Sequence, residues 1–173
     1  CGYIDSNGFE SPDGKSLIVR IKTQMMYLVD SSCTVIKEYQ VSTAKNGAGN
    51  AEGSNKTPYG IHKIVKIAGI GNKKGDYYDN DFNVVGNAQI YTDSTDSPDD
   101  LVMTRVFVLE GMQEGMNRGD GIDSFKRKIF VHGTNEEGLI GMPMSKGCVR
   151  MKNDDIIELS ERIEEGTILL IID

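Results

Sequence analysis

The sequence Lys128-Ile129-Phe130-Val131-His132-Gly133-Thr134 leads through a short spacer into Ser145-Lys146-Gly147-Cys148-Val149-Arg150-Met151. It contains one of the two histidines and one of the three cysteines of the chain, 148 − 132 = 16 residues apart. Cysteine attacks as the thiolate, and a nearby imidazole can lower the thiol pKa and carry the proton that acyl transfer requires. The pattern therefore indicates a cysteine acyltransferase.

The residues around His132 and Cys148 indicate that the two side chains come together in the fold. Lys128 to Val131 is a β-rich run that would deliver His132 at the end of a strand, where Gly133 frees the backbone to turn. A glycine-containing loop then lets the chain fold back toward Cys148. The alternative is that Cys148 is an ordinary buried cysteine that behaves as a small hydrophobe.

Gly147, directly before Cys148, also has two interpretations. Without a side chain, it lets a substrate carbonyl approach two successive N–H groups, which would form an oxyanion hole. Alternatively, it serves a tight turn between the loop and the next strand.

The ordered set of motifs resembles the YkuD-type L,D-transpeptidase catalytic domain. The signature is HGT, a spacer, and S-x-G-C-V-R-M, and the likeness extends from about residue 17 to residue 172. The further matching segments are Ser42–Gly47, Lys56–His62, Arg105–Leu109, Asn117–Gly119 and Gly166–Ile171.

The resemblance implies a mostly β, sandwich-like or barrel-like fold and chemistry on bacterial peptidoglycan stem peptides. Cysteine would attack the carbonyl at the L-centre of a diamino acid in a tetrapeptide stem and expel the terminal D-alanine. The thioester would pass to an amine of another stem peptide (a 3-3 crosslink), of a lipoprotein, or of a free D-amino acid. Inhibition by carbapenems and a location in the cell envelope are also implied. An L,D-carboxypeptidase and a non-catalytic wall-binding protein remain alternatives.

By the same resemblance, Cys148 is the nucleophile and His132 the general base. A carbonyl of Gly133 or Thr134 would orient the imidazole, replacing the carboxylate of a Ser-His-Asp triad. Gly147 and Cys148 would supply the oxyanion-hole N–H groups.

Three further positions of the signature are expected to shape the substrate pocket. Ser145 and Arg150 match it, and Arg150 would either pair with a substrate carboxylate or brace the site through a salt bridge. Lys146 departs from it, because many relatives have histidine there. An ammonium at this position would favour the thiolate or attract an acidic peptide, or it would be a solvated surface lysine.

Composition narrows the class of protein. The 173 residues are 26% charged and 38% hydrophobic, with a net charge of −7, so we expect a globular domain that does not bind nucleic acid. Anionic substrates must then be met by local basic groups such as Arg105, Lys146 and Arg150. Two distant histidines and no C-x-x-C pair predict no metal site, and no cofactor is expected.

Domain organisation is expected to be simple. Residues 1–16 are polar and predict a tether or leader remnant, followed by a catalytic domain over 17–173. Cys1 followed by Gly2 resembles a lipidated lipoprotein terminus. Cys33 lies at an expected hairpin turn, where it is either an ordinary thiol or a disulfide partner of Cys1.

Period-2 alternation predicts the elements of a mostly β domain. Strands are expected over Leu17–Lys22, Met25–Asp30 and Val35–Val41 as an antiparallel meander, which Tyr59–Ile67 would continue. A short helix capped by Asn153 would bury Ile156, Leu159 and Ile163 and end near Gly166, before a last strand over Thr167–Ile172.

The segment from Gly69 to Asp100 is a long polar insertion. We expect either a flap over the substrate cleft, with Tyr77 and Tyr78 as contacts, or a surface loop with locally buried tyrosines. Asp93 to Asp100 lacks the calcium-loop pattern and is interpreted as a solvated acidic turn.

Overall fold

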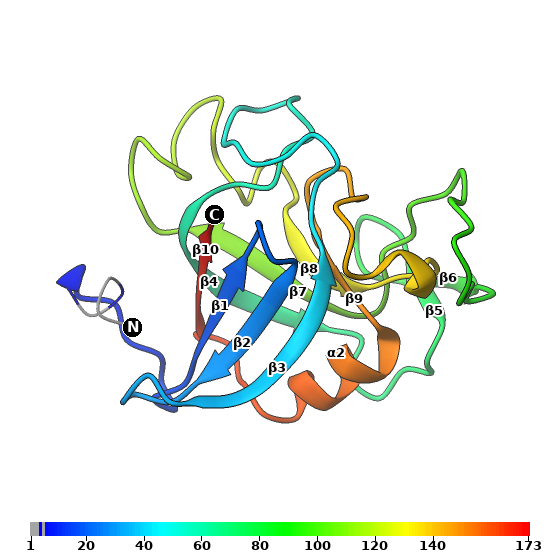
Figure 1. Cartoon of the computed structure of the whole chain (residues 1–173), viewed down its shortest axis with the longest axis horizontal. Helices are drawn as coiled ribbons and strands as arrows, with labels where there is room; N and C mark the ends of the chain where they lie inside the picture. Colours follow the sequence, from blue (N-terminus) through cyan, green and yellow to red (C-terminus); the bar gives the residue numbers. More distant parts are fainter. Residues whose placement is uncertain (1–3, 5) are drawn as a thin grey trace.

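The computed structural model describes residue 4 and residues 6–173, and within them the chain is mostly β (Figure 1). The strands are β1 (Ser16–Arg20), β2 (Met25–Val29), β3 (Val35–Ser42), β4 (Gly60–Ala68), β5 (Asp76–Tyr78), β6 (Val84–Asn87), β7 (Met103–Gly111), β8 (Phe130–Gly133), β9 (Val149–Met151) and β10 (Ile168–Ile172). A 3-10 turn, η1 (Glu137–Leu139), and a helix, α2 (Asn153–Ser160), complete the core domain. The expected mostly β class is confirmed.

The sheet closes on itself as a barrel. Its order is β4-β10-β1-β2-β3-β9-β8-β7, and β7 pairs again with β4. β1, β2 and β3 form the expected antiparallel meander. The expectation that β4 continues this meander is wrong, because β4 pairs with β10 and β7, while β9 occupies the edge of β3. The physical reason is that closure recruits strands distant in sequence, which abolishes open edges.

Alternation along the strands fills the barrel. Leu17 and Val19 of β1 are fully buried, whereas Ser16 before them and Ile18 between them are partly exposed. Phe107 of β7 is also fully buried and belongs to the main core cluster with them. In β1, period 2 therefore reports the inward face correctly.

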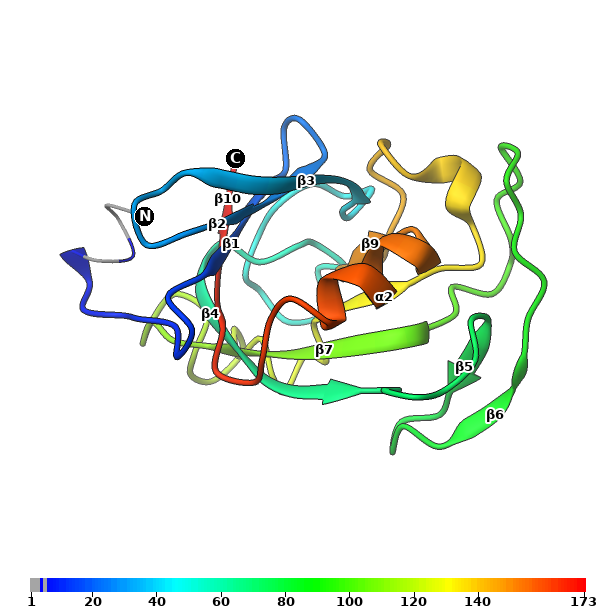
Figure 2. The ribbon, with the colours of Figure 1, turned by 90° about the horizontal axis from the view of Figure 1, so that it is seen from below.

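α2 packs against β7 and β8 and lies between β3 and β7 in the view of Figure 2. Ile156, Leu159 and Ile163 are buried in the main cluster, as predicted. The predicted cap is shifted by one residue: Lys152 precedes the first helical turn, and Asn153 is the first helical residue. The carboxylate of Glu137 accepts a hydrogen bond from the Asn153 N–H at 2.8 Å and so caps the helix from η1. The helix also ends earlier than predicted, at Ser160.

The insertion after β4 forms the β5–β6 hairpin, which is attached to the edge of β7 through Tyr77 and Met103. Figure 2 shows this hairpin at the end of the domain beyond β7. Within the described part of the chain, no helix is long and apolar enough to cross a bilayer.

The described residues before β1 lie against the barrel. Ile4 is 2% exposed and packs with Ile61, Ile168 and Leu170, with Phe9 alongside. The Ser11 hydroxyl accepts a hydrogen bond from the Ile168 N–H at 2.8 Å. Cys1, and with it the lipidation and disulfide expectations for that residue, lies outside the described residues. Cys33 is a free, exposed thiol in the turn before β3.

Phe107→Ala tests the packing of the barrel interior. Removing this fully buried ring should lower the free energy of unfolding by about 3–5 kcal/mol, through lost burial and the cavity left behind. Urea denaturation followed by circular dichroism measures the change. Val35→Ala is the control, because Val35 is 47% exposed, and its effect should stay within about 0.5 kcal/mol. Equal effects of the two substitutions would contradict the assigned core.

Candidate active site

The parallel pairing of β8 with β9 positions the two signature residues. Its register sets Val131 opposite Val149 and His132 opposite Arg150, so Cys148 enters β9 beside the start of β8. A parallel pair needs a crossover of about a dozen residues or more, and the segment 134–148, which contains η1, supplies it. The spacing of 16 residues in the signature thus leaves room for the crossover that a parallel pair requires.

Cys148 is half-buried, and its sulfur lies against the backbone that leads into β8. The Phe130 N–H points to Sγ at 3.4 Å, and Sγ is 3.5 Å from the Lys128 carbonyl oxygen. Burial raises the pKa of the Cys148 thiol to about 12, opposed by the Phe130 N–H and assisted by the negative charge of Asp100. At neutral pH the Cys148 side chain is therefore a neutral thiol.

His132 shares a hollow of about 400 Å³ with Cys148. The imidazole is buried, and its Nδ1 lies 2.8 Å from the Gly133 carbonyl oxygen, so Nδ1 carries the proton and Nε2 is left as the basic nitrogen. Burial lowers the pKa of His132, although Asp100 and the Gly133 carbonyl oppose this. At neutral pH the ring is therefore uncharged and able to accept a proton. The Gly133 carbonyl takes the orienting place expected for Gly133 or Thr134.

Gly133 is required for a reason other than the expected turn. It is the last residue of β8, and a Cβ there would lie 2.8 Å from the Met103 carbonyl oxygen and 3.0 Å from Cβ of Thr104. Asn153 packs against the same point, and its Nδ2 donates to the Thr134 carbonyl at 2.7 Å. Glycine is required here because β7 and the start of α2 approach β8 closely.

Ser145 and Gly147 build the turn before Cys148. The Ser145 hydroxyl donates to the Cys148 carbonyl at 2.6 Å and accepts from the Gly147 N–H at 3.2 Å. Gly147 has φ of +136°, a conformation that favours glycine, and its carbonyl accepts a hydrogen bond from the Thr57 hydroxyl at 3.0 Å. Of the two N–H groups expected to form the oxyanion hole, that of Gly147 is thus directed at Ser145 in this structure.

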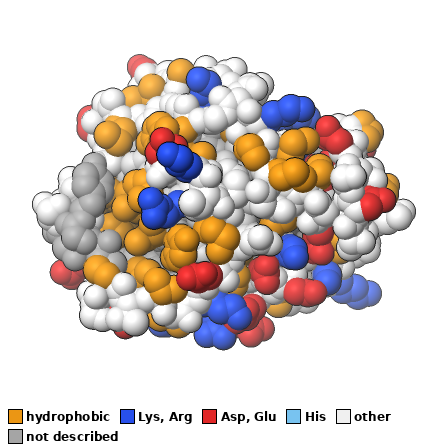
Figure 3. Space-filling view, viewed as in Figure 1, with side chains coloured by type: hydrophobic (Ala, Val, Ile, Leu, Met, Phe, Trp, Pro, Cys, Tyr) orange, Lys and Arg blue, Asp and Glu red, His pale blue; other side chains and the backbone are white. Residues whose placement is uncertain are grey.

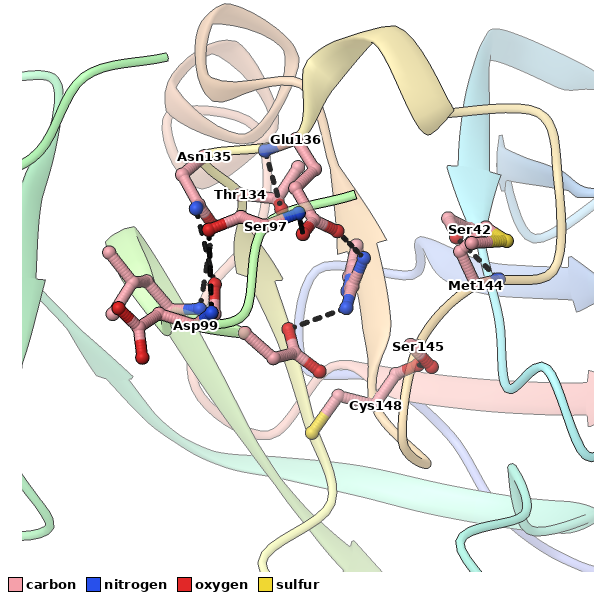
Figure 4. A network of polar contacts seen from close by, with 12 residues as sticks. Ser42, Ser97, Asp99, Thr134, Asn135, Glu136, Met144, Ser145 and Cys148 are labelled. Carbon is pink, nitrogen blue, oxygen red and sulfur yellow. Dashed lines mark hydrogen bonds and ion pairs between the residues drawn. The ribbon is translucent and has the colours of Figure 1, made fainter. Parts of the chain in front are cut away.

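Arg150 is held by two carboxylates of the protein. Its Nη1 lies 2.5 Å from Oε2 of Glu136, and its Nη2 lies 2.8 Å from Oδ1 of Asp100. Arg150 and Glu136 are 2% and 1% exposed. Figure 4 draws this network beside Cys148. Arg150 therefore braces the site, which is the second of the two roles considered for it.

The same network fastens the segment 97–101 over the site. Glu136 accepts a hydrogen bond from the Ser97 N–H through Oε1 at 2.7 Å, and Asn135 donates to the Asp99 carbonyl at 3.2 Å (Figure 4). Residues 98–102 line the hollow that contains Cys148. The interpretation of Asp93–Asp100 as a wholly solvated turn is wrong at Asp100, because a buried arginine needs a carboxylate partner. The sequence alone does not identify Asp100 and Glu136 as these partners, because the burial of Arg150 is evident only in the folded structure.

Of the remaining residues predicted to contact the substrate, Lys146 lines the hollow and the two tyrosines do not. Lys146 is exposed and lines the hollow with Cys148 and His132. Thr134 is buried, and its hydroxyl accepts from the Glu136 N–H at 3.1 Å. Tyr78 is buried and donates to the Thr104 carbonyl at 3.0 Å. Tyr77 lies on β5 and packs on Gly86, so the structure brings neither tyrosine to the hollow, and residues 98–102 form its wall instead.

Charge on the surface is mixed. On the face drawn in Figure 3, basic and acidic side chains are interspersed with hydrophobic ones. Arg105, expected among the local basic groups, is buried and donates to the carbonyls of Asn72 and Thr104 at 3.1 and 2.7 Å. Of the three expected anion-binding groups, Lys146 is thus the one exposed at the site.

Comparison with known proteins agrees with this geometry. The family model of the YkuD L,D-transpeptidase catalytic domain matches residues 14–171, and the chain belongs to this family. The chain is 48% identical over 42 residues to YkuD of Bacillus subtilis, an alignment that covers 24% of this chain and 26% of that protein. It is 46% identical over 47 residues to ErfK/SrfK of Salmonella typhimurium, covering 27% of this chain and 15% of that protein.

Solved structures share the fold. An L,D-transpeptidase from Mycobacterium smegmatis superposes with a TM-score of 0.56 at 12% identity, covering 92% of this chain and 59% of that chain. The L,D-transpeptidase from Xylanimonas cellulosilytica superposes with a TM-score of 0.53 at 17% identity, covering 99% and 68%. The barrel with its short helix is therefore the L,D-transpeptidase fold.

The negative charge of Asp100 should slow the reaction of the Cys148 thiol with an alkylating agent. Because the thiol pKa is raised to about 12, iodoacetamide alkylation should be slow at pH 7 and climb about tenfold per pH unit toward pH 11. Asp100→Asn removes a negative charge that raises this pKa, so alkylation at pH 8 should become faster. Asp99→Asn is the matched control and should leave the rate unchanged. A slower rate in Asp100→Asn would contradict the assigned electrostatics.

Arg150→Ala should destabilise the protein strongly. It leaves the buried Glu136 carboxylate unpaired, a change that typically costs about 3–5 kcal/mol. The control is Arg162→Ala, which removes the surface pair with Glu158, where less than about 1 kcal/mol is expected. Denaturant midpoints of both variants give the comparison, and similar small losses would show that the Arg150 pairs contribute little.

Proposed function

We propose that the protein is a peptidoglycan L,D-transpeptidase in which Cys148 is the nucleophile and His132 the general base. The observation that carries this is that the thiol and the neutral imidazole line one hollow, with Nδ1 of His132 held by the Gly133 carbonyl. Membership of the family supplies the reaction class. The donor is a tetrapeptide stem whose third residue is a diamino acid.

The two pKa shifts determine how the first step runs. With the thiol pKa raised and the imidazole pKa lowered, the resting pair is neutral rather than a thiolate and an imidazolium. His132 Nε2 therefore takes the thiol proton as Sγ attacks the carbonyl at the L-centre of the diamino acid. The C–N bond to the terminal D-alanine then breaks, and His132 returns the proton to the leaving amine.

An amine completes the reaction. It attacks the thioester carbonyl, His132 accepts the amine proton, and the C–S bond breaks to restore the thiol as the proton returns to sulfur. The acceptor is the side-chain amine of a second stem peptide, an amine of a lipoprotein, or a D-amino acid. The Cys148 N–H, and the Gly147 N–H once it is released by Ser145, would hold the oxyanion in both halves.

Two alternative functions would use the same residues. If water replaces the amine, the protein is an L,D-carboxypeptidase. If the thiol is never activated, it is a wall-binding protein that retains the cleft. The uncharged, oriented imidazole beside Cys148 favours the catalytic proposals, because a binding protein has no need of a proton acceptor there.

Inhibition by carbapenems and a location in the cell envelope follow from the proposed chemistry. A solved L,D-transpeptidase, LdtMt1, is described in complex with imipenem, and it superposes on this fold with a TM-score of 0.54 at 12% identity. We propose that Cys148 opens the strained β-lactam ring in the same way as it attacks a stem peptide. The substrate lies in the bacterial cell wall, so the protein would act in the envelope, whether or not Cys1 carries a lipid.

Cys148→Ala tests the proposal directly. The wild type incubated with a disaccharide-tetrapeptide should release D-alanine, with a crosslinked dimer accumulating at high substrate concentration, and the variant should release none because no thioester forms. Mass spectrometry follows both products and any imipenem adduct. Cys33→Ala is the control and should retain full activity, since this exposed thiol lies in the β2–β3 turn. Release of D-alanine by Cys148→Ala would refute the assigned nucleophile, whereas hydrolysis alone would select the carboxypeptidase.

A further inference from the structure

A groove of about 680 Å³ lies on the outer face of the barrel, along the strand that carries His132. Its floor is a row of side chains in register across three adjacent strands: Phe130 of β8 pairs with Val108 of β7, which pairs with Lys66 of β4. Their neighbours Val131 and Phe107 belong to the barrel core, so this row faces outward.

Aromatic rings form the walls of the groove. The rings of Phe82 and Phe130 meet edge to face with centroids 5.7 Å apart, and the ammonium of Lys66 lies 4.6 Å from the centre of the Phe82 ring. Phe125 faces them from the loop before β8 and is 53% exposed. An exposed aromatic side chain in a hollow that its own fold does not fill is typical of a binding site.

The groove and the hollow of Cys148 each share lining residues with a third, smaller hollow. This smaller hollow has a volume of about 170 Å³, and its lining includes Phe82, Val102 and Phe130. Val102 also lines the hollow of Cys148, and Phe82 and Phe130 also line the groove. Along β8 itself, Phe130 lies on the same face as His132, two residues away, or roughly 7 Å.

The rim is polar and mainly cationic. Lys66, Lys126 and Lys128 line the groove together with one carboxylate, that of Glu110. Lys128 donates to the side-chain carbonyl of Asn80 at 2.8 Å, which fixes two hydrogen-bonding groups at one edge. In a chain of net charge −7, this local excess of ammonium groups is suited to an anionic or hydroxyl-rich ligand.

We propose that this groove binds the sugar of the peptidoglycan strand from which the donor stem peptide branches. The inference rests on the proposed function. The attacked carbonyl is separated from the sugar by the diamino acid itself and two further residues, which together span roughly 10 Å when extended. Sγ of Cys148 lies 3.4 Å from the backbone nitrogen of Phe130, whose side chain lines the groove, so an extended stem seated at Cys148 reaches the aromatic walls with its sugar.

The surface chemistry selects a saccharide over more peptide. Sugar rings present C–H faces that stack on aromatic side chains, and a rim of hydroxyls that both donate and accept hydrogen bonds. The groove offers Phe82, Phe125 and Phe130 for the faces, and ammonium, amide and carboxylate groups for the rim. It also has no row of unpaired strand edge along which a peptide could add, because β4, β7 and β8 are paired on both sides within the described sheet.

Phe125 is the residue to change, because it is exposed and its loss should not unfold the protein. We expect the wild type to turn over a disaccharide-tetrapeptide with a kcat/KM about five times that of the sugar-free tetrapeptide. Phe125→Ala should abolish that preference and leave kcat/KM for the sugar-free tetrapeptide unchanged. Phe125→Trp keeps an aromatic face and should retain it, and Val35→Ala, which lies away from the groove, should behave as the wild type.

A binding measurement separates this inference from the proposed function. The chain contains no tryptophan, so Phe125→Trp creates a single fluorescent reporter in the groove. A peptide-free disaccharide should change its emission saturably, whether or not any substrate is turned over. Failure of the wild type to release D-alanine from either substrate would defeat the proposed function, while this titration would still test the groove.

Three results would overturn the saccharide assignment. They are the absence of a saturable response to the disaccharide, an equal response to the sugar-free tetrapeptide, and an unchanged substrate preference in Phe125→Ala. The second result would identify the groove as a peptide site.

Discussion

The buried ion pair between Arg150 and Glu136 is the interaction on which the site depends. Arg150 belongs to β9, which begins directly after Cys148, and Glu136 to the crossover that follows β8, so their contact at 2.5 Å ties the two halves of the signature together. Both partners are buried away from water, and each charge stabilises the other, because a buried charge without a partner strongly destabilises the fold. The pair thus fixes the position of β9 relative to the crossover.

Glu136 extends this constraint to the wall of the substrate hollow. One of its oxygens binds Arg150 and the other accepts from the Ser97 N–H, so a segment far away in sequence is fastened to the same point. Asp100 completes the arrangement on Nη2 of Arg150 and lies close enough to influence both the thiol and the imidazole. One carboxylate thereby links the position of the wall to the protonation of Cys148 and His132.

The site combines a thiol whose pKa is raised with an imidazole whose pKa is lowered. Burial is the largest cause of both pKa shifts, and it acts in opposite directions because it disfavours the thiolate and the imidazolium alike. If Cys148 acts as the proposed nucleophile, a neutral pair requires that the thiol is deprotonated as it attacks. The Gly133 carbonyl makes this workable, since it orients the imidazole without adding a charge.

Local patterns in the sequence were sufficient for much of the fold. Alternation identified β1, β2 and β3 and their antiparallel order, and helical periodicity identified Ile156, Leu159 and Ile163 as the buried face of α2. The place of β4 could not be found in this way. Its partners β10 and β7 are chosen by closure of the barrel, a long-range event that leaves no mark on the period of a single strand.

By itself, the sequence determined the mostly β class, the family, and the candidate pair Cys148 and His132, because these depend on residue types at fixed spacings. Tertiary structure decided what surrounds that pair. It turned Arg150 inward onto Glu136 and Asp100, buried Tyr78, and made residues 98–102 the wall of the hollow. It also joined the faces of β4, β7 and β8 into one aromatic groove. The physical reason is that burial and charge pairing are properties of neighbours in space, and the neighbours here come from different segments of the chain.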